Sequence, residues 1–234
     1  MKIKVFADGA DYDEIRTLSK DDNITGFTTN PSLMAKSGVK DYKEFSMRVI
    51  EILDGKPVSL EVFSDDIEEM KSQAKKIASW DDSIYVKIPV TNSKGVSTEP
   101  IIESLSNDGI KLNITALFTE KQVTTIMKCL NKDVNSIISI FAGRIANAGV
   151  NPIPLISSTV NYVNDNLKKS EVLWASAREP YNIIEANNCG CHIITLPINF
   201  IKSMSMFGKD LEQYSLETVK MFYDDAVKSN FKID

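Results

Sequence analysis

The chain has 234 residues, of which 43% are hydrophobic and 25% are charged, and its formal net charge at pH 7 is −5. This composition is typical of a globular protein that is long enough to bury a sizeable core. The negative charge gives no general attraction to nucleic acid or to an anionic membrane, so any anion site must be built from a few local residues.

Several features of the sequence indicate a cytoplasmic protein. Asp8 interrupts the first apolar run, which is too short for a signal peptide, and no run of eighteen apolar residues predicts a membrane span. Three cysteines without framework spacing favour a reducing compartment. Cys189, Cys191 and His192 match no common zinc spacing, so we expect no metal there and interpret His192 as a core or strand-start residue.

Short runs rich in β-branched and aromatic residues alternate with segments of helical spacing along the whole chain. The predicted strands are residues 3–7, 24–29, 58–63, 84–90, 111–118, 136–142, 171–175 and 192–198. The predicted helices are residues 12–20, 42–53, 65–79, 98–106, 120–130, 153–167, 181–187 and 215–229. Thr119 and Gln122 have the spacing of a capping box at the start of the helix at 120.

Strict alternation of strand and helix predicts a parallel sheet covered by helices, and eight such units predict a closed (β/α)8 TIM barrel of the α/β class. The alternative is a doubly wound open sheet, but no G-x-G-x-x-G follows the first strand. We expect residues 1–214 to form the barrel and residues 215–234 to form an extra C-terminal helix. Its apolar stripe packs either on its own barrel or on a neighbouring subunit, and contains Leu216, Val219, Phe222, Tyr223 and Ala226.

Lys87 lies in the middle of the fourth predicted strand, in the run I-Y-V-K-I-P-V. An unpaired ammonium is costly to bury, so Lys87 must reach water, pair with a carboxylate, or serve as a buried amine in chemistry. Burial disfavours the charged form and nearby carboxylates favour it, so the sequence leaves this balance open. A neutral lysine amine can attack a ketone and form a Schiff base.

Other polar side chains lie near the predicted carboxyl ends of the strands, where barrel enzymes carry their chemistry. They are Asp8, Asn30, Glu61, Asn113, Thr115, Arg144, Ser176 and Arg178. Each has a structural alternative: a helix cap for Asp8, a turn for Asn30, a structural ion pair with Lys87 for Glu61, and rim ion pairs for the arginines. Together they favour function, because carboxylates can move protons near Lys87 and arginines bind phosphate. They predict an enzyme for a phosphorylated keto sugar that needs no metal or cofactor.

Five ordered motifs resemble those of the transaldolase family, in the small subfamily that also contains fructose-6-phosphate aldolase. They are residues 26–32 (GFTTNPS), 86–89 (VKIP), 113–118 (NITALF), 141–145 (FAGRI) and 175–178 (ASAR). The resemblance implies a (β/α)8 barrel in which Lys87 holds a dihydroxyacetone unit as an enamine. It further implies transfer of this unit from fructose 6-phosphate to erythrose 4-phosphate, the reaction of pentose-phosphate metabolism.

The same resemblance implies a role for each candidate residue. Asp8 moves the hydroxyl proton, Glu61 and Thr115 hold a water, Asn30 and Asn113 bind the three-carbon unit, and Arg144, Ser176 and Arg178 bind phosphate. Glu61 and Phe141 resemble the transaldolases, whereas aldolases of this size have Gln and Tyr at these positions. A lyase that releases free dihydroxyacetone is therefore the alternative, followed by a sugar-phosphate-binding barrel without turnover.

Two further expectations come from the resemblance. Small members of the family form pentamers or decamers, so we expect a homo-oligomer whose last helix reaches a neighbouring subunit. The sequence departs from the family at Asn147, where an Asp is usual, and at Trp174 and Ala177. These departures put the orientation of the arginine and the shape of the phosphate pocket in question.

Overall fold

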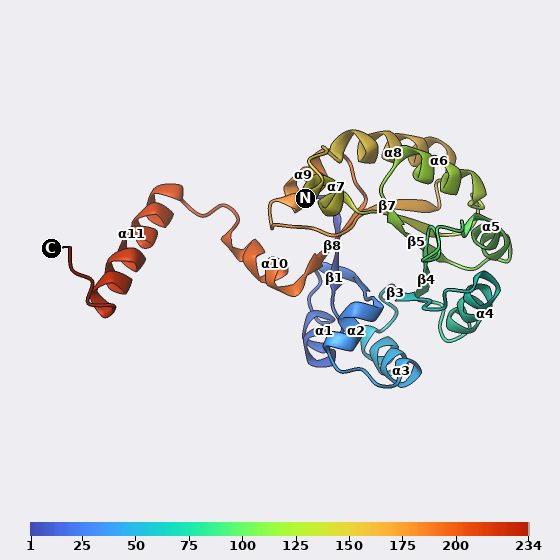
Figure 1. Cartoon of the computed structure of the whole chain (residues 1–234), viewed down its shortest axis with the longest axis horizontal. Helices are drawn as coiled ribbons and strands as arrows, with labels where there is room; N and C mark the ends of the chain where they lie inside the picture. The colour runs from blue at the N-terminus through green and yellow to red at the C-terminus, as the bar shows by residue number, and fades with distance from the viewer. Residues whose placement is uncertain (234) are drawn as a thin grey trace. The chain divides into compact units, whose positions relative to one another are not determined.

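The computed structural model describes residues 1–233, which divide into two compact units. The first unit is Met1–Ile201, and the second begins at Lys202. In the first unit the strands form a ring with helices on its outside (Figure 1).

Eight parallel strands close into one barrel in sequence order, each pairing with the next and β8 pairing with β1. The strands are β1 (Lys4–Asp8), β2 (Ile24–Thr28), β3 (Val58–Glu61), β4 (Ile84–Pro89), β5 (Leu112–Leu117), β6 (Ser136–Ile140), β7 (Ser170–Trp174) and β8 (Ile193–Pro197). The predicted (β/α)8 barrel is confirmed, and the open-sheet alternative is wrong because the sheet has no free edge.

The helices follow the strands in alternation, with short extra helices after β2, β6 and β8. They are α1 (Tyr12–Leu18), α2 (Pro31–Lys36), α3 (Tyr42–Leu53), α4 (Ile67–Ala78), α5 (Glu99–Asn107), α6 (Glu120–Cys129), α7 (Ala142–Asn147), α8 (Ile153–Asn166), α9 (Asn182–Asn188), α10 (Ile198–Ser203) and α11 (Leu211–Lys228). The helices α2, α7 and α10 were not predicted, because six residues are too few to display a helical period.

Side-chain caps define where several helices begin. Asp11, Asp41 and Asp66 each accept a hydrogen bond from a backbone N–H in the first turn of α1, α3 and α4. The capping box predicted at Thr119 and Gln122 is confirmed at the start of α6. Each cap satisfies a backbone donor that has no partner within the helix.

The barrel interior has an apolar floor beneath its polar mouth. Phe6, Ile137, Leu173, Ala175 and Ile193 form a buried cluster, with Tyr85 and Phe141 packed against it. Successive strand residues point to opposite faces, so Tyr85 and Lys87 share the interior face of β4 while Val86 and Ile88 point toward the helices. The interior residue that follows Tyr85 on β4 is therefore Lys87.

The register of β3, β4 and β5 aligns three polar residues. Glu61 pairs with Lys87, and Lys87 pairs with Asn113. Paired residues on neighbouring parallel strands project to the same face, so the three side chains form one polar layer inside the barrel. This alignment is a property of the sheet and is independent of any single strand.

The second unit contains α11, which begins at Leu211 rather than at the predicted residue 215. The Asp210 side chain caps it by accepting a hydrogen bond from the Gln213 N–H, which explains the earlier start. No residue of α11 is buried, and the exposed fractions of Val219 and Phe222 are 59% and 63%. No helix of residues 1–233 is both long and apolar enough to cross a membrane.

Candidate active site

Lys87 is the buried cation of the barrel mouth, with an exposed fraction of 8%. Its Nζ lies 3.0 Å from Glu61 Oε2 and donates to the Thr29 carbonyl oxygen at 3.2 Å. A lysine ammonium has three donors, so two are engaged by the protein and one position remains, while the side chain lines a cavity. The amine is therefore shielded from bulk water and still open to a bound molecule.

Asp8 faces the same cavity from the end of β1, and a chain of hydroxyl groups holds its carboxylate. Thr28 Oγ1 donates to Asp8 Oδ1 at 2.8 Å, and the Thr28 and Thr195 hydroxyl oxygens are 2.5 Å apart. Because the single Thr28 hydrogen goes to Asp8, Thr195 donates to Thr28. Burial raises the pKa of Asp8, and the Lys87 charge and the Thr28 hydrogen bond oppose this rise.

Asp8→Asn should make the protein more stable at pH 8. The folded-state pKa of Asp8 is above its usual value of 3.8, so the stability that this group contributes is complete below pH 3.8. That stability is lost as the pH rises through the raised pKa, because the buried group must then ionise. The asparagine side chain avoids this loss, so the advantage of the variant should grow from pH 4 to pH 8 in thermal unfolding.

Asp65→Asn provides the opposite control. Hydrogen bonds from the Ser93 backbone N–H and hydroxyl lower the pKa of this exposed carboxylate. Its stabilising effect is therefore present above the usual pKa and lost as the pH falls, so this variant should be less stable than the parent at pH 8. A lower melting temperature for Asp8→Asn at pH 8 would contradict the burial argument.

Asn113 and Thr115 occupy the interior face of β5. The Asn113 amide donates to Ser59 Oγ at 2.8 Å, and its oxygen accepts from Ser139 Oγ at 2.6 Å. The Thr115 hydroxyl is buried and has no hydrogen-bond partner within the described chain. A buried hydroxyl without a partner is costly, so Thr115 is suited to hold a water or a substrate oxygen.

Asn30 combines a structural position with a place in the cavity wall. Its side-chain oxygen accepts from the Leu33 N–H at 3.0 Å and caps α2, where Pro31 is the first helical residue. The local alternative for Asn30 was a turn, and the structure shows a helix cap in its place. The cap uses the amide oxygen, which leaves the NH2 group of this cavity-lining residue for a ligand.

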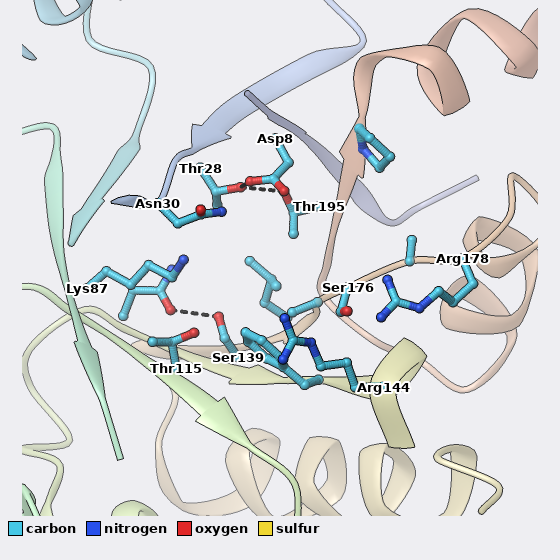
Figure 2. Close-up of a pocket in the computed structure, with 16 residues that line it drawn as sticks. Asp8, Thr28, Asn30, Lys87, Thr115, Ser139, Arg144, Ser176, Arg178 and Thr195 are labelled. Carbon is cyan, nitrogen blue, oxygen red and sulfur yellow. Dashed lines mark hydrogen bonds between the residues drawn. The ribbon is translucent and has the colours of Figure 1, made fainter. Parts of the chain in front are cut away.

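Two cations, Arg144 and Arg178, and the hydroxyl of Ser176 lie on the other side of the cavity from Lys87, as Figure 2 shows. Arg144 is on α7, one turn beyond β6, whereas Ser176 and Arg178 are in the segment that follows β7. The sixth strand, predicted over residues 136–142, therefore ends earlier, at Ile140, and Arg144 follows it on a helix that was not predicted. Neither arginine forms an ion pair with a carboxylate of residues 1–233, so the rim ion pairs considered as an alternative are absent there.

A close approach at Gly143 brings α7 against the segment after β7. A Cβ atom at this position would lie 1.7 Å from the Ser176 carbonyl oxygen, so only glycine fits. Ser176 itself has a φ of 65°, in the left-handed region that is unusual for a residue with a side chain. This contact places Arg144, Ser176 and Arg178 together.

The cavity has a volume of about 280 Å3 and opens at the carboxyl ends of the strands. It contains nine of the ten predicted site residues; the tenth, Glu61, reaches the site through Lys87 instead of lining the cavity. Three polar lining residues were not among the predicted site residues: Thr28, Ser139 and Thr195. All three lie on the interior face near the end of a strand. Small hydroxyl residues do not stand out there in a sequence, so only this position could have indicated them.

Two residues considered at the sequence level lie elsewhere. Trp174 does not line the cavity, because Leu173 and Ala175 occupy the interior face on either side of it. His192 is at the start of β8, where its Nδ1 accepts from the Val172 N–H at 2.9 Å and its Nε2 lies 3.1 Å from Asn164 Oδ1. The interpretation of His192 as a strand-start residue is confirmed. Among residues 1–233, no cluster of His, Cys, Asp and Glu could hold a metal ion.

Fold and site together define a (β/α)8 barrel with a buried lysine, paired with a carboxylate, among polar residues at the carboxyl ends of the strands. Comparison with known families agrees, because residues 5–233 match the model of the transaldolase/fructose-6-phosphate aldolase family. The chain belongs to this family, as its motifs indicated.

Curated relatives extend over nearly the whole chain. A probable transaldolase of Thermoanaerobacter sp. (strain X514) is 34% identical over 99% of this chain and 100% of its own length. A probable transaldolase of Desulfotalea psychrophila is 35% identical over 91% of this chain and 96% of its own length. These relatives support a transaldolase-family enzyme.

Solved structures with low sequence identity share the fold alone. The N-acetylneuraminate lyase of Mycoplasma synoviae has a TM-score of 0.53 and 13% identity, with 97% of this chain and 82% of the lyase covered. A mutant flavocytochrome b2 has a TM-score of 0.59 and 15% identity, with 89% of this chain and 59% of that chain covered. Both likenesses are those of the barrel architecture.

Proposed function

We propose that the protein is a transaldolase that transfers a dihydroxyacetone unit from a ketose phosphate to an aldose phosphate through a Schiff base on Lys87. The donors are fructose 6-phosphate or sedoheptulose 7-phosphate, and the acceptors are erythrose 4-phosphate or glyceraldehyde 3-phosphate. The observation that supports this proposal is the 3.0 Å pair of Lys87 and Glu61 in a cavity whose other side carries two arginines without acidic partners.

Schiff-base formation requires proton transfer at the amine and loss of a water. The neutral Lys87 amine attacks the ketose carbonyl carbon, and the resulting carbinolamine is protonated on oxygen and loses that oxygen as water. Glu61 is close enough to take a proton from the amine and return one to the departing hydroxyl. The Thr115 hydroxyl, which lacks a partner, holds that water.

Carbon–carbon cleavage requires a base at the next hydroxyl. In our proposal Asp8 accepts the proton of the C4 hydroxyl, the C3–C4 bond breaks, and its electron pair moves into the iminium to give an enamine on Lys87. The aldose phosphate leaves, and the reverse steps join the enamine to the acceptor aldehyde, with Asp8 returning the proton. Water then releases the new ketose, while Asn30 and Asn113 hold the hydroxyls of the three-carbon unit.

The phosphate group belongs to the fragment that leaves and to the acceptor that replaces it. Arg144, Ser176 and Arg178 therefore serve both aldoses, and guanidinium groups bind phosphate through paired, charge-assisted hydrogen bonds. Phe141 lines the cavity and packs on the interior core cluster, with the Arg144 guanidinium carbon 5.6 Å from the centre of its ring. Its ring has no proton to give the enamine, so the intermediate waits for an acceptor instead of releasing dihydroxyacetone.

An exchange assay with fructose 6-phosphate, run with and without erythrose 4-phosphate, tests the proposal. We expect sedoheptulose 7-phosphate to form only when the acceptor is present. Rapid, steady release of free dihydroxyacetone without acceptor would instead identify a lyase. Binding of fructose 6-phosphate without either product would identify a binding protein and overturn the transferase.

We also propose that the enzyme serves pentose-phosphate metabolism in the cytoplasm.

We propose further that α11 docks on a second copy of the chain in a homo-oligomer, a pentamer or decamer. Leu216, Val219 and Phe222 are about half exposed or more, and such an apolar stripe needs cover. Phe222→Glu should lower the mass measured by light scattering. Lys228→Gln changes the charge equally on the opposite side of the helix and should not. Equal masses for all three proteins would contradict this assembly.

A further inference from the structure

Asn147 is the last residue of α7, one helical turn after Gly143, and lies on the side of α7 that approaches the segment after β7. With the amide oriented to satisfy both of its ends, its nitrogen donates to the Gly143 carbonyl oxygen at 3.1 Å. Its oxygen accepts from Arg178 Nε at 3.0 Å. The amide is therefore held by its own helix and in turn holds a side chain from another segment.

This hydrogen bond decides which edge of the Arg178 guanidinium faces the cavity. A guanidinium offers a lateral edge, formed by Nε and one Nη, and an end-on edge formed by both Nη atoms. Asn147 occupies Nε and so leaves the end-on edge for a ligand. Paired hydrogen bonds to one phosphate group fit this edge.

The same contact leaves the charge of Arg178 intact. An amide is neutral, whereas a carboxylate at this position would sit within ion-pair distance of the guanidinium. No carboxylate of residues 1–233 pairs with Arg178 or with Arg144. Both positive charges thus remain available to an anion.

We propose that Asn147 is a positioning residue for Arg178, one that presents the end-on edge of the guanidinium and leaves two uncompensated charges for a dianionic phosphate. The inference rests on the proposed phosphate site and extends it to a residue that touches no substrate. It identifies the neutral amide at position 147 as a feature that tunes phosphate affinity in this chain.

Binding of inorganic phosphate at pH 8, followed by 31P NMR titration at several salt concentrations, tests this role without turnover. Asn147→Asp should weaken binding by about three- to fivefold, the scale of one exposed ion pair, and should make the salt dependence shallower. Asn147→Ala should weaken binding by about twofold, the loss of one exposed hydrogen bond, with the salt dependence unchanged. With fructose 6-phosphate as substrate, both variants should raise KM and leave kcat within about twofold of the parent.

Ala146→Asp is the matched control, since it adds the same charge to the neighbouring exposed position of α7. It should change phosphate affinity less than Asn147→Asp does. Equal effects of the two aspartates, an unchanged salt dependence in Asn147→Asp, or no saturable phosphate binding by the parent would each overturn the proposal. If the parent, Asn147→Ala and Asn147→Asp bind phosphate with decreasing affinity but the parent exchanges no sugar, the proposed function is wrong and this inference still holds.

Discussion

Lys87→Met should lower the rate of sugar exchange by roughly 10^4-fold or more, the scale expected when a covalent nucleophile is removed. Methionine has nearly the length and flexibility of lysine, so the barrel interior keeps its packing while the amine is lost. The Glu61 carboxylate, whose side chain is 17% exposed, loses its cationic partner at the same time. Loss of activity is thus expected together with some loss of stability.

Covalent capture separates these two effects. The parent protein, incubated with fructose 6-phosphate and reduced with borohydride, should carry a three-carbon adduct on Lys87 in the peptide mass spectrum. The methionine variant should carry none, although circular dichroism shows it folded. Full activity of the variant, or an adduct on another lysine, would contradict the proposed chemistry.

Lys56→Met is the control for removing a partly buried lysine. Lys56 Nζ donates to the carbonyl oxygens of Ser19, Asp21 and Ile24 at 2.8–3.0 Å, so it ties backbone segments together and lies outside the cavity. This variant should melt at a lower temperature than the parent and retain exchange activity. The comparison distinguishes a lysine required for stability from one required for catalysis.

Gly143→Ala should both destabilise the barrel and weaken substrate binding. Its methyl carbon would lie 1.7 Å from the Ser176 carbonyl oxygen and 2.8 Å from the Ser176 carbonyl carbon, so backbone must move. Overpacking of this kind costs about 3 kcal/mol, which for a protein of this size lowers the melting temperature by roughly 6–12 °C. The movement displaces Ser176 and Arg178, so KM for fructose 6-phosphate should rise by about tenfold or more.

Gly109→Ala controls for the loss of a glycine without a clash. Gly109 has a φ of 83° and open space around its missing Cβ, and it precedes the amino end of β5 and does not line the cavity. Alanine at this position should lower the free energy of unfolding only by the cost of its left-handed backbone conformation, about 1–2 kcal/mol. It should lower the melting temperature less than Gly143→Ala and leave KM unchanged. Equal KM values for the parent and Gly143→Ala would show that the contact does not shape the site.

Local patterns in the sequence determined the fold class. Eight alternations of strand and helix can close only as a parallel barrel, and each strand was identified by a short β-rich run whose signal does not depend on its neighbours. The polar residues at the strand ends could be predicted for the same reason, because a charged side chain within an apolar run can be recognised from the sequence alone. Lys87 is the clearest example.

Local patterns did not predict the short helices. The helix α7 has six residues, and its first residue, Ala142, falls within the strand predicted over residues 136–142. Propensity over one turn of helix is too weak to decide between strand and helix. The close approach of Gly143 to the backbone of Ser176, a contact between segments far apart in sequence, is visible only in the folded chain.

The sequence alone thus determined the architecture, the reactive lysine and the set of polar candidates, because these depend on local periodicity and residue chemistry. Only the tertiary structure decided how they meet. The register of three strands set Glu61, Lys87 and Asn113 side by side, and the closed ring brought Thr195 of β8 to Thr28 of β2. These pairings depend on sheet closure, in which each strand is aligned by its neighbours and none specifies the alignment by itself.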